Sequence, residues 1–399
     1  MEASSRSAAC VKVLLEFGAD VNHHFEEDDD NYGNYYTALS LACEAGCNEA
    51  AELLLKHGAD PRDNSYSMYH ACRNGDIKFV KLLIAHGGDV NDNEYNYTTP
   101  LIGACERKGG NIEMIELLLS HGAQVNCDDC KCYQSLQVAF EGHRYDVMDY
   151  LLANGADIDG YADYDEYGEA SFLAVACGFS KEYNSYEQTD KAMVNFLLEH
   201  GADMYLPSLW GELPFAVAYN ADSPDMSILH MFFDHGFDIN AMNEEHMGSN
   251  SNIVLADACK YADLDAIRLF IQHGADVNCM RQDRDVNHSG DPDDLHVSTA
   301  VISACHYGVE DALLLLLEYG ADVNLLDERG NTPLMYLCKN YDITQDMLPC
   351  VSILLEYGLE LRVVNMAGMT VFDFLEEGCE LAVMLKNHLE STDRKPLLK

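Results

Sequence analysis

The sequence contains the stretch Leu14-Leu15-Glu16-Phe17-Gly18-Ala19-Asp20-Val21-Asn22, which returns with one change at residues 316–324. This pattern, Leu-Leu-x-x-Gly-Ala-Asp-Val-Asn, recurs with substitutions, and its glycines are Gly18, Gly58, Gly87, Gly122, Gly155, Gly201, Gly236, Gly274, Gly320 and Gly358. A second phrase, similar to Thr-Pro-Leu-x-x-Ala-Cys, is interleaved with it at residues 37–43, 99–105, 299–305 and 332–338. Self-similarity at a period of about 33 residues indicates a repeat architecture rather than a set of separate globular domains.

Residues 77–84 illustrate how one unit is built. Ile77, Val80 and Ile84 fall on one helical stripe with Leu83 beside it, and the two lysines of the segment fall off it. The repeat glycine then supplies a left-handed residue just past the helix end. Such a helix cannot bury its apolar face alone, so neighbouring units must stack into a solenoid.

These phrases resemble the ankyrin repeat, a unit of about 33 residues with a β-turn and two antiparallel helices. The resemblance covers residues 1 to about 390 and implies an all-α solenoid of about ten helix–turn–helix repeats, with finger loops and a C-terminal capping helix pair. We expect residues 1–368 to form the array, with an incomplete first repeat. Residues 369–390 are expected to form the capping helices and residues 391–399 a frayed tail.

One departure from the family pattern is systematic. The histidine that usually follows Thr-Pro-Leu is absent, so the local hydrogen bonding that it provides is not expected in this chain. The residues at its position are Ser40, Tyr69, Ile102, Gln137, Ala174, Ala216, Ala256, Ile302 and Met335.

The cysteines follow the repeat. Seven of the fifteen occupy one position of the first helix: Cys43, Cys72, Cys105, Cys177, Cys259, Cys305 and Cys338. A small hydrophobic residue packed between helices explains them, and stacked repeats about 10 Å apart hold equivalent thiols too far apart for disulfides. With no signal peptide and no apolar run near the roughly 20 residues of a membrane span, an intracellular, cytoplasmic location is predicted.

The net charge restricts the partners. With 68 acidic and 24 basic residues, the formal charge is −44. A charge of this sign repels phosphate backbones and anionic headgroups, so neither nucleic acid nor membrane is expected as a partner. Hydrophobic residues make up 48% of the chain and are regularly placed, which excludes a disordered acidic polymer.

Acidic residues are concentrated where the repeat is lengthened. The loop between the Asn and the next Thr, called the finger here, is longer than standard at residues 22–37, 159–171, 240–253 and 278–299. The inner residues of these fingers hold sixteen acidic side chains against two basic ones, about a third of the net charge. Long loops on one side of a solenoid often form its binding side.

Tyrosines accompany these acids, and together they predict a binding surface for a protein with a basic patch or a basic peptide. The candidate residues are Glu26, Glu27, Asp28, Asp29, Asp30, Tyr32, Tyr35, Tyr95, Tyr97, Tyr161, Asp163, Tyr164, Asp165 and Tyr167. The alternative is that these are solvated loops whose charge keeps a long array in solution.

Two further clusters have simpler explanations. Cys127, Cys130 and Cys132 lie close enough in sequence to suggest zinc, but no second cysteine pair completes a site, so exposed cysteines without metal are favoured. A histidine precedes the repeat glycine in six repeats, where it interacts favourably with carbonyls at a helix C-terminus. No cofactor is predicted.

Nothing in the sequence predicts catalysis, because it contains no phosphate loop, nucleophile elbow or metal-protease histidine pair. The favoured function is a non-enzymatic scaffold or adaptor that binds a basic partner through the concave face and the acidic fingers. Alternatives are a regulatory or inhibitory subunit that masks a basic enzyme or nucleic-acid-binding surface, and a host-directed effector.

Overall fold

The computed structural model describes residues 8–26, 35–62, 66–92, 99–106, 111–126, 135–163, 169–179, 189–207, 213–220, 225–241, 254–279, 281–283, 296–326, 329–340 and 347–393. The chain divides into two compact units. Unit 1 comprises Met1–Phe172 and Glu199–Ala202, and unit 2 comprises Leu173–Leu198 and Asp203–Lys399. Each unit is described by itself.

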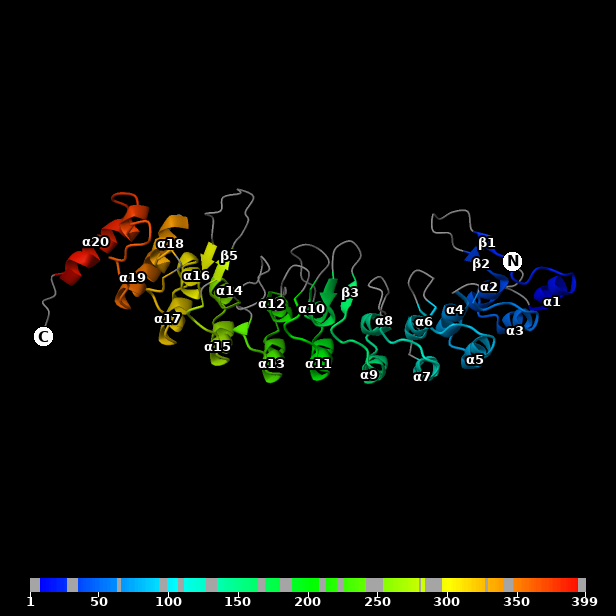
Figure 1. Cartoon of the computed structure of the whole chain (residues 1–399). Helices are drawn as coiled ribbons and strands as arrows, with labels where there is room; N and C mark the ends of the chain where they lie inside the picture. Colours follow the sequence, from blue (N-terminus) through cyan, green and yellow to red (C-terminus); the bar gives the residue numbers. More distant parts are fainter. Residues whose placement is uncertain are drawn as a thin grey trace. The chain divides into compact units, whose positions relative to one another are not determined.

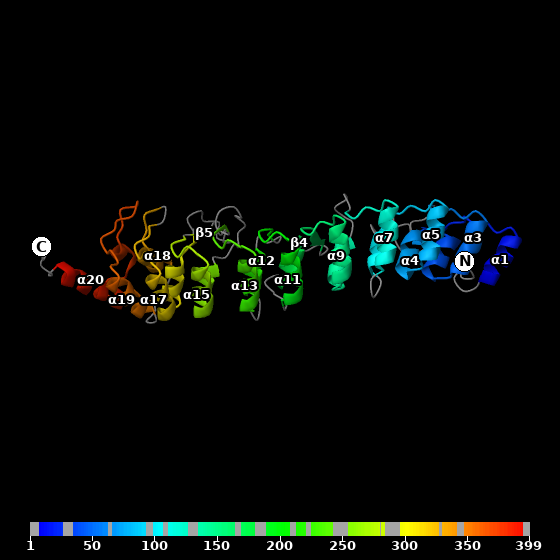
Figure 2. The same ribbon diagram turned by 90° about the horizontal axis from the view of Figure 1, so that it is seen from below.

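Unit 1 is built from pairs of short helices (Figure 1). Its helices are α1 (Ala8–Glu16), α2 (Ala38–Glu44), α3 (Asn48–Lys56), α4 (Tyr66–Asn74), α5 (Ile77–Ala85), α6 (Pro100–Glu106), α7 (Ile112–Ser120), α8 (Ser135–Glu141) and α9 (Tyr145–Ala153). The first helices of successive repeats, α2, α4, α6 and α8, pack in a row, and each contacts the second helix of its own repeat. The second helices α5, α7 and α9 follow one another in chain order in Figure 2.

Unit 2 repeats the same arrangement. It contains most of α10 (Phe172–Ala176) and α11 (Lys191–Glu199), followed by α12 (Pro214–Asn220), α13 (Met226–Asp234), α14 (Val254–Lys260), α15 (Leu264–Gln272), α16 (Ala300–His306), α17 (Glu310–Glu318), α18 (Pro333–Asn340), α19 (Leu348–Glu356), the 3-10 helix η4 (Val371–Phe374) and α20 (Glu380–Asp393). Helix α16 contacts α14 and α18, and α17 contacts α15 and α19. Both units therefore have the stacked helix pairs of an all-α repeat solenoid.

Threonine side chains cap the N-termini of several first helices. Thr37 Oγ1 accepts a hydrogen bond from the Ser40 amide at 3.1 Å, and Ser40 Oγ accepts one from the Thr37 amide at 2.9 Å, a reciprocal capping box. Ser40 stands where the family has histidine, so in this repeat a serine hydroxyl accepts the hydrogen bond from the threonine amide. The hydroxyls of three further threonines each accept a hydrogen bond from the amide three residues later, at N–O distances of 3.1 to 3.3 Å. They are Thr99, Thr299 and Thr332.

The repeat glycines end the second helices. All ten have positive φ angles, from 81° at Gly18 and Gly201 to 94° at Gly87. A residue with a Cβ is disfavoured in this conformation, which explains why glycine recurs there. This confirms the prediction made from the repeat phrase.

The core lies between the helices of each pair and between neighbouring pairs. The residue four positions before the repeat glycine is at most 2% exposed in nine repeats: Leu54, Leu83, Leu118, Leu151, Leu197, Phe232, Phe270, Leu316 and Leu354. In unit 2 the Phe215 ring stacks on Phe237 with centroids 4.5 Å apart. In α5, however, Phe79, Val80 and Leu83 are the buried residues. The predicted stripe was therefore partly wrong, because Ile77 and Ile84 lie only half-buried at its edge.

All seven first-helix cysteines are buried, as predicted, and none of the cysteines in the described ranges forms a disulfide. Burial raises the pKa of the thiols of Cys43, Cys105, Cys259 and Cys338 to about 12. The thiols are therefore neutral packing groups at physiological pH.

Asparagine side chains join successive finger bases. Asn91 Nδ2 donates to the Gly122 carbonyl at 2.9 Å, and Asn91 Oδ1 accepts from the Gln124 amide at 2.7 Å. The same two bonds are made by Asn22, Asn126, Asn240, Asn278 and Asn324. This ladder explains the final Asn of the repeat phrase, because one amide satisfies a carbonyl and an N–H of the next repeat.

The C-terminal end differs in detail from the expectation. Residues 371–374 form the 3-10 helix η4 rather than an α-helix, and α20 continues to Asp393, beyond the predicted end at residue 390. No glycine or proline interrupts residues 380–393, and Thr392 Oγ1 donates to the His388 carbonyl at 3.1 Å. Among the helices that the structure describes, none has the length and apolar character needed to cross a membrane.

Candidate partner-binding surface

Three lengthened fingers rise from two-stranded antiparallel hairpins, each leading into a first helix. They are β1 (Phe25–Glu26) with β2 (Tyr35–Tyr36), β3 (Tyr161–Asp163) with β4 (Glu169–Ser171), and β5 (Arg281–Asp283) with β6 (His296–Ser298). Ser171 at the end of β4 is buried, as are Thr37 after β2 and Thr299 after β6. The second strand of each hairpin is thus anchored where the finger meets the core.

In the hairpin β1–β2 an acidic residue stands opposite a tyrosine. Glu26 is the Cα partner of Tyr35, and Phe25 is the partner of Tyr36. Of the predicted site, the structure therefore brings Glu26 and Tyr35 to opposite positions of one hairpin. Four further acids and one tyrosine predicted for this finger lie outside the described residues: Glu27, Asp28, Asp29, Asp30 and Tyr32.

The hairpin β3–β4 places two acids directly opposite each other. Asp163 is the Cα partner of Glu169, and Tyr161 is the partner of Ser171 on the same hairpin. Like charges at directly opposite positions destabilise a strand pair. The remaining predicted residues of this finger, Tyr164, Asp165 and Tyr167, lie outside the described ranges.

The hairpin β5–β6 has a more balanced charge. Asp283 is opposite His296, and Arg281 is opposite Ser298. This finger therefore lacks an opposed pair of acids in its described part, in contrast to β3–β4. Tyr95 and Tyr97, predicted for another finger, and the cluster Cys127, Cys130 and Cys132 all fall outside the described residues. Within the described part of the chain, no group of three or more His, Cys, Asp or Glu residues could hold a metal ion.

Sequence reasoning missed a polar cluster at the C-terminal ends of α4 and α6. Tyr69 Oη donates to Glu106 Oε1 at 2.7 Å, and Arg73 Nε lies 3.1 Å from Glu106 Oε2. Arg73 and Glu106 each directly follow a repeat cysteine, and this shared register was the signal that they would be neighbours. Burial is the main reason that the pKa of the adjacent His70 falls to about 4, with the Arg73 charge adding to it, so this imidazole is neutral.

Unit 2 carries an aromatic and cationic cluster at the equivalent position, also missed from the sequence. The Lys260 ammonium lies 4.9 Å from the ring centroid of Tyr261 and 5.7 Å from that of Tyr307. Both tyrosines are exposed. The ends of the first helices therefore differ between the units, with a carboxylate network in unit 1 and a cation among tyrosines in unit 2.

Histidines before the repeat glycines have a structural role. The Nδ1 atoms of His57, His86, His121 and His235 lie 2.8 to 2.9 Å from the carbonyl oxygens four residues earlier. A carbonyl only accepts, so each Nδ1 carries the proton that it donates. This confirms the prediction of a helix C-terminal contact for these four histidines.

The stacked helix pairs and projecting hairpins define a helical repeat protein. Residues 1–65, 68–161 and 282–365 match the family model for ankyrin repeats in three copies, and because these matches cover more than half of the sequence, the chain belongs to the ankyrin-repeat family. Ankyrin repeats are generally protein–protein interaction modules, and proteins of the family are typically non-enzymatic binding scaffolds.

Among curated proteins, no sequence matches this chain. Among solved structures, the chain is similar to the ankyrin repeat domain of human ASB11, at 20% identity with a TM-score of 0.44. That similarity covers 59% of this chain and 97% of the ASB11 domain.

Proposed function

We propose that this protein is a scaffold or adaptor that binds a partner with a basic surface or basic segment, and that the acidic, tyrosine-containing fingers make the contact. The observation that carries the proposal is the opposed pair Asp163 and Glu169 on the hairpin β3–β4. The pairing of Glu26 with Tyr35 on β1–β2 supports it.

The opposed acids favour a cationic partner for an electrostatic reason. Directly opposite residues of an antiparallel pair have Cα atoms about 4.5 to 5.5 Å apart, so two carboxylates there repel each other. An arginine or lysine of a partner binding both carboxylates removes this repulsion and adds charge-assisted hydrogen bonds. The repulsion in the free protein thus becomes part of the binding free energy.

Tyrosine beside acid suits the same partner. A tyrosine ring supplies rigid apolar contact area and a hydroxyl, and tyrosine is enriched in protein interfaces. Its ring face also attracts a guanidinium or ammonium group. Tyr161 and Asp163 are two residues apart on β3.

The net charge of −44 assists over longer distances. A surplus of negative charge accelerates the approach of a basic protein and makes its binding sensitive to salt. Short-range specificity then depends on the fingers, since the surplus attracts every basic protein.

The proposal is tested by capture on the immobilised 399-residue chain, with bound proteins identified by mass spectrometry. The test variant is Asp163→Asn with Glu169→Gln, and the control is Glu113→Gln with Glu116→Gln, which removes the same charge from the exposed face of α7. We expect basic proteins that the control retains and the finger variant loses. Equal retention by both variants would contradict the proposal.

The identity of the captured proteins separates two roles. Several unrelated basic partners indicate a scaffold. One basic enzyme, recovered stoichiometrically and inhibited in the complex, indicates a regulatory subunit that masks a basic surface.

A further inference from the structure

The Lys260 ammonium in unit 2 lies between two tyrosine rings that belong to neighbouring repeats. Its distances to the ring centroids are 4.9 Å for Tyr261 and 5.7 Å for Tyr307, both within the range of a cation–π contact. Tyr261 directly follows α14 and Tyr307 directly follows α16, and these two helices pack against each other (Figure 1). Tyr261 and Tyr307 are called the tyrosine pair below.

The surroundings of the tyrosine pair favour a positive charge. Partial burial opposes the charge of Lys260, yet its pKa is raised, with a hydrogen bond to Tyr261 as the largest favourable cause and Asp257 also contributing. Asp257 stands three residues before Lys260 on α14. Burial lowers the pKa of His306, which precedes Tyr307, so this imidazole is neutral at physiological pH. The tyrosine pair is therefore a place where this protein stabilises a single cation.

The equivalent position of unit 1 also holds a cation. Arg73, like Lys260, directly follows a repeat cysteine, and its Nε lies 3.1 Å from Glu106 Oε2 of the next repeat. In unit 2, His306 stands at the position of Glu106. The cation of unit 1 is thus held by a carboxylate of the next repeat, whereas that of unit 2 meets a ring face there, which binds an exposed cation weakly. Lys260 is therefore easier to displace than Arg73.

The tyrosine pair is accessible, and the backbone beside it is strained. Tyr261 is 63% exposed and Tyr307 is 47% exposed. Ala262, which follows Tyr261, has a φ of 57°, whereas Gly46 and Gly308 take the equivalent positive-φ positions of two other repeats. A residue with a Cβ is disfavoured in this conformation, and such outliers cluster at functional sites. The chain thus keeps an unfavourable turn directly beside an exposed ring.

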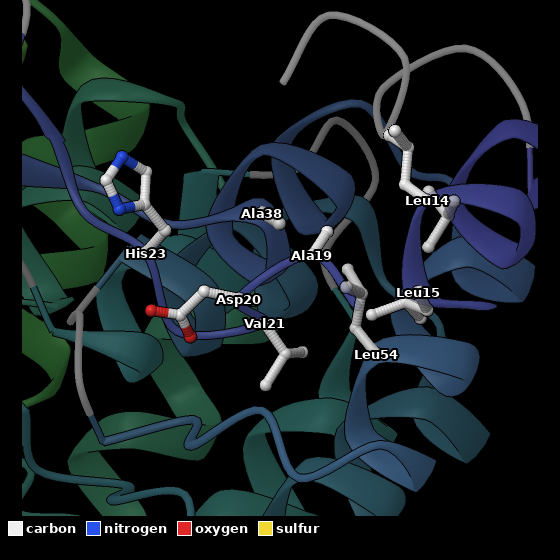
Figure 3. Close-up of a pocket in the computed structure, with 9 residues that line it drawn as sticks. Leu14, Leu15, Ala19, Asp20, Val21, His23, Ala38 and Leu54 are labelled. Carbon is white, nitrogen blue, oxygen red and sulfur yellow. The ribbon is translucent and has the colours of Figure 1, made fainter. Parts of the chain in front are cut away.

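A pocket beside α1 and α3 in unit 1 suits a cation less well. It has a volume of about 290 Å³ and is lined mainly by aliphatic side chains (Figure 3). In the figure, Leu14, Leu15 and Leu54 lie on one side of it, and Asp20 and His23 lie on the other. Aliphatic walls remove water from a cation without supplying a ring face or a hydroxyl in return. A cationic side chain therefore favours the tyrosine pair over this pocket.

We propose that the tyrosine pair binds an arginine side chain of the partner, and that Lys260 occupies the site until this arginine displaces it. The inference rests on the basic partner of the proposed function, but it does not depend on the fingers. Arginine suits the site better than lysine, because its planar guanidinium stacks on aromatic faces and is more weakly hydrated. The displaced Lys260 ammonium returns to water, and the net charge of −44 favours the incoming cation.

The test uses a peptide of three Gly-Ser-Arg units as the probe. The 399-residue chain is labelled with 3-fluorotyrosine, and the affinity at the site is read from the fluorine resonance of Tyr307, which Tyr307→Phe assigns. Lys260→Met removes the resident cation. Its control is Lys386→Met, because Lys386 is an exposed lysine of unit 2 whose loss changes the net charge equally. We expect Lys260→Met to bind the peptide about two- to fivefold more tightly than Lys386→Met, the equivalent of one exposed cation–π contact.

A second pair of variants tests the ring face itself. Tyr261→Leu removes one ring and Tyr261→Phe keeps it, while Tyr307 reports binding in both. We expect the leucine variant to bind the peptide about two- to fivefold more weakly than the phenylalanine variant. Both variants should keep the circular dichroism spectrum of the wild-type chain. A matched peptide of three Gly-Ser-Glu units should leave the Tyr307 resonance unchanged.

Equal affinities of Lys260→Met and Lys386→Met would overturn the proposal, as would equal affinities of Tyr261→Leu and Tyr261→Phe. A Tyr307 resonance that the arginine peptide does not shift would also overturn it. If the glutamate peptide binds the wild-type chain and Lys260→Met abolishes that binding, the site takes an anion and the arginine is rejected. The finger variant Asp163→Asn with Glu169→Gln should keep the Tyr307 response, so this proposal and the finger contact can fail separately.

Discussion

Asp163 and Glu169 are directly opposite residues of the antiparallel pair β3–β4. Like charges at directly opposite positions destabilise a strand pair. Ala170 and Ser171, which follow Glu169, are buried. The pair places two acidic residues together at the base of a finger, with an expected loss of hairpin stability.

Replacing one of these acids by a base should stabilise the hairpin and weaken partner binding. Glu169→Lys converts a repulsive pair into an attractive one, with an expected gain of about 0.2 to 1 kcal/mol in the free energy of unfolding. Urea denaturation measures the gain, and Glu169→Gln should give an intermediate value. If Glu169→Lys stabilises the protein but the variant still captures the same basic proteins, the acid pair does not take part in binding.

The asparagine ladder should contribute measurably to stability. Asn91→Ala removes the bonds to the Gly122 carbonyl and the Gln124 amide. At about 0.5 to 1.5 kcal/mol for each bond, the expected loss is about 1 to 3 kcal/mol in urea denaturation. Asn91→Asp keeps an acceptor for the Gln124 amide but sets a second acceptor against the Gly122 carbonyl, so it should lose stability as well. If the two variants unfold at the wild-type midpoint, the ladder is not stabilising.

The buried cysteines predict a loss of stability at alkaline pH. Burial raises the thiol pKa from 9.0 to about 12 in Cys43 and Cys105, so above pH 9 the unfolded chain loses thiol protons that the folded chain retains. Deprotonation then favours the unfolded state, and stability is complete below pH 9 and falls as the pH rises. Each thiol contributes a slope of up to about 1.4 kcal/mol per pH unit.

Denaturation between pH 8 and 11 measures this slope. Cys43→Ala should make the slope shallower than in the wild-type chain, because it removes one buried thiol. A slope identical to that of the wild type would show that this buried thiol is not a source of the pH dependence.

His70 predicts a loss of stability at acidic pH. Its pKa falls from 6.5 to about 4 in the folded protein, mainly because it is buried. Between these values the unfolded chain binds a proton that the folded chain does not, so the contribution of His70 is present above pH 6.5 and is lost as the pH falls toward 4. The loss should reach about 3 kcal/mol.

The control for His70 is His70→Gln, which cannot titrate in this range. Carboxylates also titrate below pH 5, so the informative quantity is the difference between the wild-type and variant curves from pH 7 to 4. Parallel curves would mean that His70 is protonated in the folded state as readily as in the unfolded state.

The repeat phrase predicted what depends on local conformation. The glycines needed a left-handed backbone, and the first-helix cysteines needed a small apolar residue, so both could be located by counting along the chain. The burial of Phe79 instead of Ile77 depends on which helices surround α5. The apolar pattern of one helix does not show where the neighbouring helices lie.

The same reason explains what was missed at the site. The contact between Arg73 and Glu106 joins residues more than thirty positions apart, and the cluster of Lys260 with Tyr307 likewise joins two repeats. Aligning the residues after each repeat cysteine would have made these pairs neighbours, because equivalent positions of adjacent repeats stack. The opposition of Asp163 and Glu169 needed the strand register, which no composition or spacing supplies.

The salt dependence of partner binding tests the central claim most directly. A captured basic partner is titrated against the wild-type chain, Asp163→Asn with Glu169→Gln, and Glu113→Gln with Glu116→Gln, at several ionic strengths. We predict that the finger variant binds more weakly and has a flatter dependence of affinity on salt, while the control, with the same net charge, keeps the wild-type dependence. Equal salt dependences for the two variants would contradict the claim, because the overall charge rather than the fingers would then hold the partner.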